Sequence, residues 1–212
     1  MMESTQKKVS QKLLALNTIK IQPNNPFTWA SGWKSPIYCD NRKILSYPEA
    51  RTFIRDKFAE IIREKYPQAE VIAGVATGAI AHGVLVADKL DLPFIYVRSK
   101  PKGHGLENLI EGEMKPGQKV VVIEDLVSTG ISSLKAAEAI NNFGAEVIGM
   151  LSIFTYNFNQ AIEAFRKASI ELTSLSKYQN LIDMALEMGE ITRDQIQTLM
   201  EWREDPANWQ NK

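Results

Sequence analysis

The sequence has few of the residues on which disulfide bonds and zinc sites depend. Cys39 is its one cysteine, and His82 and His104 are its two histidines. A single cysteine excludes a disulfide within the chain, and so few cysteines and histidines exclude a cluster spaced for zinc. Such cysteine usage fits a reducing compartment, and we expect the protein to be cytoplasmic.

Long apolar runs and an excess of charge of one sign are also missing. No apolar stretch approaches the roughly 18 residues that a membrane span needs, and the first residues lead into no stretch of signal-peptide length. The 25 Lys and Arg residues balance the 25 Asp and Glu residues. A neutral protein lacks the long-range field that drives sequence-independent binding to nucleic acid. We therefore expect neither membrane nor nucleic acid as a partner.

What is present is ordinary globular composition, with 44% hydrophobic and 24% charged residues in 212. Folding at this length buries roughly 70% of the surface that the unfolded chain exposes, which is enough for one sizeable core. No internal repeat or low-complexity segment interrupts the chain. The composition therefore predicts a folded protein rather than a fibre or a disordered chain.

The hydrophobic period changes repeatedly between strand and helix. A capping-box pattern at Ser46 and Glu49 predicts the start of a helix that Pro67 ends. The other expected elements are strands at 71–75, 94–97, 120–123 and 147–154, and helices at 78–90 and 134–143. Alternation of this kind specifies an α/β fold with a parallel sheet flanked by helices, whose ligands collect beyond the carboxyl ends of the strands.

The two ends of the chain differ from this middle. Residues 1–45 hold a helix and two short extended pieces, and we expect them to form a small N-terminal hood. Residues 46–212 are expected to form the core together with C-terminal helices. A second capping-box pattern, at Thr192 and Gln195, predicts a helix to about Arg203, followed by a tail. Residues 157–212 have helical patterning that indicates packing, and we assign them no chemistry.

The stretch VVVIEDLVSTGIS, residues 120–132, has the composition of a phosphate site. A buried strand leads through Glu124 and Asp125 into a turn with hydroxyl groups that opens a helix. Free N–H groups at a helix start bind phosphate, and Gly130 allows the backbone to approach closely. Two carboxylates would repel a phosphate lying on them but accept hydrogen bonds from ribose hydroxyls. The whole pattern suits a ribose 5-phosphate better than the alternative, a capped helix beside two solvated acids.

Two further segments offer groups for a polyanion. The turn GVATGAI, residues 74–80, has glycines and a hydroxyl where backbone amides are free, although a tight connection needing glycine only for packing fits equally well. In RSKPKGHG the cations alternate at Arg98, Lys100, Lys102 and His104, among residues that disfavour regular structure. Such a loop can close over a leaving pyrophosphate and stabilise its growing charge. The alternative is a solvated basic turn.

The stretch VVVIEDLVSTGIS resembles the signature of the type I phosphoribosyltransferases, which bind phosphoribosyl pyrophosphate (PRPP). The resemblance implies that Glu124 and Asp125 contact ribose, and that Thr77 and Gly78 lie in a pyrophosphate turn. It also places Ser128 near the base. The phosphate loop that it implies consists of Leu126, Val127, Ser128, Thr129, Gly130, Ile131 and Ser132.

The run FTWASGWKSPIYCDNR, residues 27–42, is similar specifically to the orotate phosphoribosyltransferases. Their basic loop matches this chain at Arg98, Lys102 and His104. The resemblance gives catalytic roles to Lys102 and Asp125. It also implies a homodimer, because the family's loop reaches into the neighbouring subunit's site. Ser99 stands where many members have a lysine, which leaves the role of Lys100 open.

Orotate is a flat ring with a carboxylate, so its pocket needs an apolar face and a donor for the anion. Tyr38, Lys34 and Arg42 are suitable residue types, although Tyr38 also fits the core of the hood and the two cations also fit a surface. Some family members have other residues at the positions of Ala30, Gly78 and Tyr156. The individual orotate contacts therefore stay open.

The resemblance implies Mg²⁺-dependent transfer of ribose 5-phosphate from PRPP to orotate. The products are orotidine 5′-monophosphate and pyrophosphate, in the synthesis of UMP. Mg²⁺ is the expected cofactor, with no residue of the chain assigned as its ligand. Two alternatives are the same transfer to a purine and a regulator that binds PRPP without catalysis. A different base-binding region would favour the first, and a basic face or an added domain would favour the second.

Overall fold

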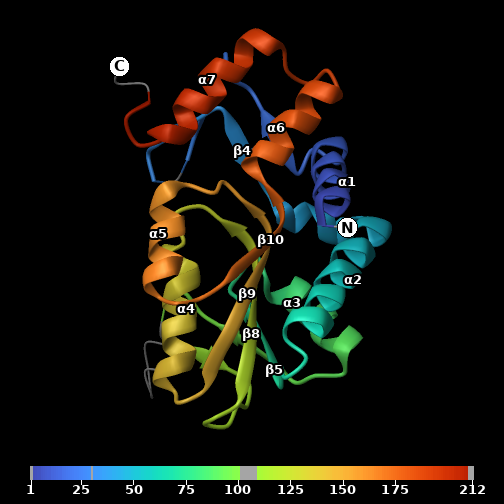
Figure 1. Ribbon diagram of the computed structural model, residues 1–212, viewed down its shortest axis with the longest axis vertical. Coiled ribbons are helices and arrows are strands. Elements are labelled where there is room, and N and C mark those ends of the chain that lie inside the picture. Colours follow the sequence, from blue (N-terminus) through green and yellow to red (C-terminus); the bar gives the residue numbers. More distant parts are fainter. Residues whose placement is uncertain (1, 30, 101–108, 210–212) are drawn as a thin grey trace.

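The computed structural model describes residues 2–29, 31–100 and 109–209, and its centre is a six-stranded sheet (Figure 1). The strand order is β10-β9-β8-β5-β6-β7, and every neighbouring pair is parallel except β6 with β7. The α/β fold expected from the sequence is thus confirmed. The strands are β5 (Val71–Val75), β6 (Phe94–Val97), β7 (Ile110–Glu111), β8 (Lys119–Val127), β9 (Glu146–Thr155) and β10 (Leu172–Lys177).

Helices cover both faces of this sheet, as Figure 1 shows. Alternate side chains of each strand enter two hydrophobic clusters, so that Ile72 and Val121 belong to one and Val71 and Val120 to the other. This is why the central strands are apolar throughout rather than alternating. The first face carries α2 (Pro48–Lys65) and α3 (Ile80–Leu90), with α1 (Met2–Ala15) and α6 (Tyr178–Glu187) beside them; the second carries α4 (Ile131–Asn142) and α5 (Asn159–Lys167).

The N-terminal segment forms two small antiparallel sheets outside the main one. They pair β1 (Ile19–Ile21) with β4 (Ile37–Cys39), and β2 (Phe27–Thr28) with β3 (Lys34–Ser35). A 3-10 helix, η1 (Asn41–Ser46), then leads to α2. At the other end of the chain, α7 (Arg193–Glu204) packs on this segment: Trp202 is fully buried and its Nε1 donates to the Lys34 carbonyl at 3.0 Å.

Several expected boundaries move in the structure. The predicted capping box at Ser46 is wrong, because Ser46 ends η1 and α2 begins at Pro48 with no side-chain cap on its Tyr47 N-cap. Proline is preorganised for the first helical position, and this preference decides the start. Strand β8 continues through Val127, so Glu124 and Asp125 lie within the strand rather than after it.

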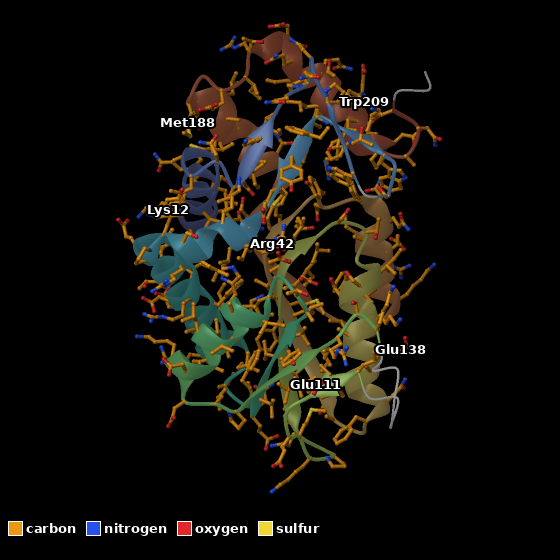
Figure 2. All side chains as sticks on the ribbon, turned by 180° about the vertical axis from the view of Figure 1, so that it is seen from behind. Lys12, Arg42, Glu111, Glu138, Met188 and Trp209 are labelled. Carbon is orange, nitrogen blue, oxygen red and sulfur yellow. The ribbon has the colours of Figure 1, made fainter. Side chains whose placement is uncertain are left out.

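The C-terminal part also differs from the expectation of helical packing alone. Residues 172–177 form β10, an edge strand whose buried positions include two serines and a threonine, so it gives no apolar run to recognise. Trp209, labelled in Figure 2, packs against the core, so the chain that follows the last helix and was expected to be a tail contacts the rest of the protein at that residue. The capping box at Thr192 and Gln195 is confirmed, and its helix runs to Glu204. No helix in the described ranges is long and apolar enough to span a membrane.

Candidate active site

The order of the strands reverses at β5, which has β6 on one side and β8 on the other. A crevice outside the carboxyl ends of the strands at such a switch point is the usual ligand site of a doubly wound sheet. A cavity of about 390 Å³ lies here, where Figure 2 shows Arg42 between the N-terminal segment and the sheet. Its lining residues are Cys39, Asp40, Arg42, Val75, Ala76, Thr77, Gly78, Glu124, Asp125, Leu126 and Ser132.

The two acids of β8 have different surroundings. Glu124 is 4% exposed, and its carboxylate accepts hydrogen bonds from the Ser133 hydroxyl at 2.8 Å and from the Asp125 N–H at 3.0 Å. Burial, followed by the nearby charge of Asp125, raises the pKa of Glu124 well above its ordinary value. Both oxygens of Glu124 therefore have partners within the chain, and the half-buried Asp125 is the better placed acid for a ligand.

Asp125 is held from two directions. The side-chain amide of Asn41 donates to the Asp125 carbonyl at 2.7 Å, which ties η1 to the end of β8. The Asp125 carboxylate lies against the backbone of Gly78, where the Cβ of any other residue would collide with it. A side chain at position 78 would therefore displace the carboxylate of the neighbouring strand.

The residues between Leu126 and Ser132 are spread over two sites. Ser132, in the first turn of α4, lines the cavity, while Ser128 lines a second one and Thr129 is half-buried between them. Gly130 has φ +82°, and a Cβ there would lie 2.9 Å from the Phe165 ring. The turn thus needs glycine twice, for its conformation and for the close approach of α5. Of the remaining three, Leu126 lines both cavities, Val127 is buried and Ile131 is exposed.

The second cavity, of about 250 Å³, adjoins the first, and the two share Cys39 and Leu126. Its other lining residues are Thr28, Trp29, Tyr38, Ser128 and Tyr156. Aromatic rings supply much of this wall: Tyr156 is stacked on Phe158 and lies 5.1 Å from Trp29 between ring centroids. Such a wall suits one flat ring.

Of the residues considered for orotate, one lines this second cavity and another lies beside it. Tyr38 is 40% exposed, so it belongs to the cavity wall rather than to a hood core. Lys34 Nζ donates to the hydroxyl of Thr28 at 2.8 Å, which places its charge beside a lining residue. Arg42 lies at the first cavity instead, paired with Asp40 at 2.7 Å.

The basic segment begins where β6 ends. Arg98 pairs with Glu111 at 3.4 Å, and its backbone N–H donates to the Leu109 carbonyl, so residues 98 and 109, on either side of the stretch that the structure does not describe, are held together. Lys100 is exposed. Lys102 and His104 lie outside the described residues, as does Ala30.

Sequence reasoning missed three residues that the structure places around the acids. Asn41 and Ser133 bond to Asp125 and Glu124, and His82 lies close enough for Asp125 to influence its pKa. Ser133 directly follows the predicted loop, so extending the loop into the first helical turn would have found it. Nothing in the sequence connects Asn41 with a strand 84 residues away.

Comparison with known proteins agrees with this geometry. The family model of the phosphoribosyl transferase domain matches residues 41–175. The orotate phosphoribosyltransferase of Phocaeicola vulgatus is 58% identical over 99% of both chains, and that of Streptococcus pneumoniae serotype 4 is 50% identical over 96% of this chain and 97% of its own.

Solved structures show the same arrangement. The orotate phosphoribosyltransferase of Aeropyrum pernix superimposes with a TM-score of 0.75 at 26% identity, over 87% of this chain and 99% of its own. The UMP synthase of Leishmania donovani gives 0.77 at 25% identity, over 93% of this chain and 42% of that longer one. A chain that matches relatives at this identity along almost its whole length, with the same fold, belongs to the orotate phosphoribosyltransferases of the phosphoribosyltransferase family.

Proposed function

We propose that the protein catalyses the reversible transfer of ribose 5-phosphate from PRPP to orotate, giving orotidine 5′-monophosphate and pyrophosphate in pyrimidine synthesis. The single observation that carries the proposal is the pair of adjoining cavities at the switch point of the sheet. One is lined by carboxylates, glycine and hydroxyl groups, and the other by aromatic rings. A phosphorylated sugar and a flat base need these two environments side by side.

The first cavity is proposed to hold PRPP. The start of α4 offers free N–H groups and the Ser132 hydroxyl to the 5-phosphate. Asp125 accepts hydrogen bonds from ribose. Glu124, which also lines the cavity, is proposed as the second ribose contact and holds the start of α4 through Ser133. The turn of Thr77 and Gly78 receives the pyrophosphate. Roles for the remaining loop residues, Leu126 through Ile131, follow from the family resemblance.

The second cavity is proposed to hold orotate. Rings of Trp29, Tyr38 and Tyr156 cover the faces of the base, and Ser128 lies at the boundary with the sugar site. Lys34 is proposed as a cation for the orotate carboxylate, because its Nζ lies beside Thr28 of the cavity wall. Some family members have an arginine near the position of Tyr156.

The donor set fits Mg²⁺ carried in by the substrate. The described residues contain no group of three His, Cys, Asp or Glu side chains that could hold a metal ion. Magnesium is commonly bound through one or two carboxylates together with substrate phosphates and water, and Asp125 and Asp40 supply carboxylates at the cavity. When bound, Mg²⁺ neutralises part of the charge that develops on the pyrophosphate.

Catalysis by the chain itself rests on positioning and on charge. The walls of the two cavities hold N1 of orotate facing C1 of the ribose. The entropy cost of bringing these two reacting atoms together is therefore met by substrate binding. Lys102 is proposed to stabilise the departing pyrophosphate, with Arg98 and His104 binding it from the same segment. Exclusion of water by this segment protects the cationic sugar that forms as the C1–O bond breaks.

We also propose a homodimer with shared active sites, in which the basic segment serves the neighbouring subunit, and a cytoplasmic location. The support is the family resemblance of that segment and, for the location, the single cysteine. Chromatography with light scattering would report the dimer. Mixing inactive variants with lesions on opposite sides of the shared site would restore activity.

The test of the activity follows orotate absorbance after PRPP and Mg²⁺ are added to the purified protein, beside reactions offering adenine, hypoxanthine or uracil. Consumption of orotate that depends on PRPP and releases one pyrophosphate per orotate supports the proposal. Turnover of a purine instead, or PRPP binding without turnover of any base, would overturn it.

A further inference from the structure

Two polar side chains are buried directly behind the first cavity without lining it. Asn41 begins η1 and is 1% exposed, and His82 lies in the first turn of α3 and is 2% exposed. Their neighbours Asp40 and Arg42 line the cavity, as does the turn before α3, but Asn41 and His82 line neither cavity. They form a layer between the cavity wall and the hydrophobic core.

A series of contacts runs through this layer to Asp125. The buried imidazole of His82 lies close enough to the Asn41 backbone and to Asp125 for both to raise its pKa. The side-chain amide of Asn41 in turn donates to the backbone carbonyl of Asp125 at 2.7 Å. Three elements that are distant in sequence, α3, η1 and β8, are thereby joined at one point. That point is the acid proposed to contact ribose.

Two atoms of this layer lack a hydrogen-bond partner among the described residues, Asn41 Oδ1 and His82 Nε2. Burying a polar atom without a partner costs free energy, whereas an apolar side chain of similar shape avoids that cost. Val86 and Ala87 on the same helix are apolar and fully packed, so this part of α3 accommodates such side chains. A polar pair kept here at a cost indicates a role other than filling the core.

The position of Asp125 is the property that this pair controls. Its carboxylate has little freedom, because the Gly78 backbone lies on one side and the carboxyl group of Glu124 is close by. A shift of the Asp125 backbone would carry the carboxylate into one neighbour or away from the sugar. Misplacement of a reacting or binding group by about 1 Å lowers rates severely.

We infer that Asn41 and His82 are positioning residues that fix Asp125 for the ribose of PRPP, acting through the Asn41 amide on the Asp125 carbonyl. The inference rests on the proposed function of the first cavity. Neither side chain touches the substrate. Removal of either side chain should therefore lower kcat/KM for PRPP and change KM for orotate little.

The kinetic test compares two substitutions of His82. His82→Leu removes both ring nitrogens, whereas His82→Asn keeps an N–H close to the position of Nδ1. We expect kcat/KM for PRPP to fall about tenfold in the first variant, the scale for loss of a supporting hydrogen bond behind a functional group. The second variant should recover most of that loss, and KM for orotate should change little in either.

Ser10→Ala is the matched control. Ser10 is fully buried, and its hydroxyl bonds to that of Ser176 at 2.7 Å between α1 and β10. This variant also breaks a buried hydrogen bond and should lower thermal stability, with kcat/KM for PRPP unchanged. Equal kinetic losses in Ser10→Ala and His82→Leu would assign His82 a merely structural role and overturn the inference.

A second measurement does not depend on whether the His82→Leu variant folds. The protein has two histidines, so ¹⁵N-histidine NMR gives two sets of signals, which the spectrum of His82→Asn assigns. PRPP with Mg²⁺ should shift the His82 signals, and orotate alone should not. Unchanged His82 signals at saturating PRPP would overturn the inference. If the unaltered protein fails to consume orotate, the proposed function fails instead, and the signals still report whether PRPP binding reaches His82.

Discussion

At the scale of single residues, the first prediction concerns the cation assigned to the leaving group. Lys102→Ala should lower kcat by roughly 10²- to 10³-fold, the range for loss of one preorganised charge donor. The fold should be intact, because Pro101, Gly103 and Gly105 around Lys102 disfavour a regular element that the substitution could disrupt. Lys100→Ala removes the same charge from the same segment and should cost much less. Steady-state kinetics of both variants check this; an unchanged kcat in Lys102→Ala would reject the catalytic role.

Gly78 gives the second prediction at this scale. In Gly78→Ala the new Cβ meets the Asp125 carboxylate, so either the turn or the acid must move. We expect kcat/KM for PRPP to fall roughly tenfold to 100-fold, since a small displacement at a reacting site is costly.

Gly189→Ala provides the control for this substitution. Gly189 has φ +74° with no atom near its missing Cβ, so alanine there is strained but touches nothing. That variant should lose thermal stability and keep its kinetics. If Gly78→Ala also loses only thermal stability, the close approach of Gly78 to Asp125 does not matter for the use of PRPP.

The residues of the candidate site differ in how well the sequence predicts them. Glu124, Asp125 and Ser132 were predicted, because the strand, the acids and the helix start lie in one continuous stretch. The pattern of that stretch alone indicates a phosphate site. Asn41 and His82 were not, because their partners are far along the chain and only the packing of three elements brings them together. A local sequence pattern reveals groups that act within one loop. It does not reveal residues that support the loop from distant parts of the chain.

At the scale of elements, the small antiparallel sheets of the N-terminal segment are expected to serve the base. Tyr38→Ala removes a wall of the second cavity, so KM for orotate should rise about tenfold while KM for PRPP changes little, as expected for loss of one aromatic contact. Tyr47→Ala is the control, since Tyr47 is as exposed as Tyr38 but lines neither cavity. Parallel changes in both Michaelis constants of Tyr38→Ala would place the base elsewhere.

Elements with strong apolar periodicity were predicted well, and those shaped by tertiary contacts were not. The strands at Val71 and Val120 are continuous apolar runs that need two covered faces, which fixes the α/β arrangement. The strand at Leu172 was not predicted, because buried serines replace apolar residues along it. Ser174, for example, bonds to Ser152 of the adjacent strand at 2.7 Å. Hydroxyl pairs of this kind satisfy polar groups only once the sheet exists.

At the scale of the whole molecule, stability should depend on pH through His82. Burial lowers the pKa of His82 below its ordinary value of 6.5, although Asp125 and the Asn41 backbone act in the opposite direction. The unfolded chain therefore takes up this proton at a higher pH than the folded chain. The stability contributed by His82 is present above pH 6.5 and is lost as the pH falls below that value.

Thermal unfolding of the unaltered protein and of His82→Asn, compared between pH 7.5 and 5.5, checks this prediction. The buried Glu124 acts with the opposite sign, since its raised pKa makes the folded state the better proton binder. Both the unaltered protein and His82→Asn retain Glu124, so the difference between their melting curves isolates the imidazole. The unaltered protein should lose more stability on acidification; parallel curves would show that His82 does not titrate in this range.

The division into a hood of residues 1–45 and a core of 46–212 stays a prediction. The contacts between the chain ends could not have been foreseen, because Trp202 of α7 donates to Lys34 and packs on Trp29 across a sequence separation that no local pattern spans. These aromatic contacts form one wall behind the second cavity. The C-terminal residues from 157 on, for which no chemistry was predicted, thus support the base site by packing.

The two adjoining cavities are proposed to hold PRPP and the base. The most direct test is a crystal structure of the protein with PRPP and Mg²⁺. We expect the 5-phosphate at the start of α4, the ribose beside Asp125, the pyrophosphate at Thr77 and Gly78, and C1 facing the aromatic cavity. PRPP bound away from β5 and β8, or with C1 directed away from Tyr38 and Tyr156, would contradict it.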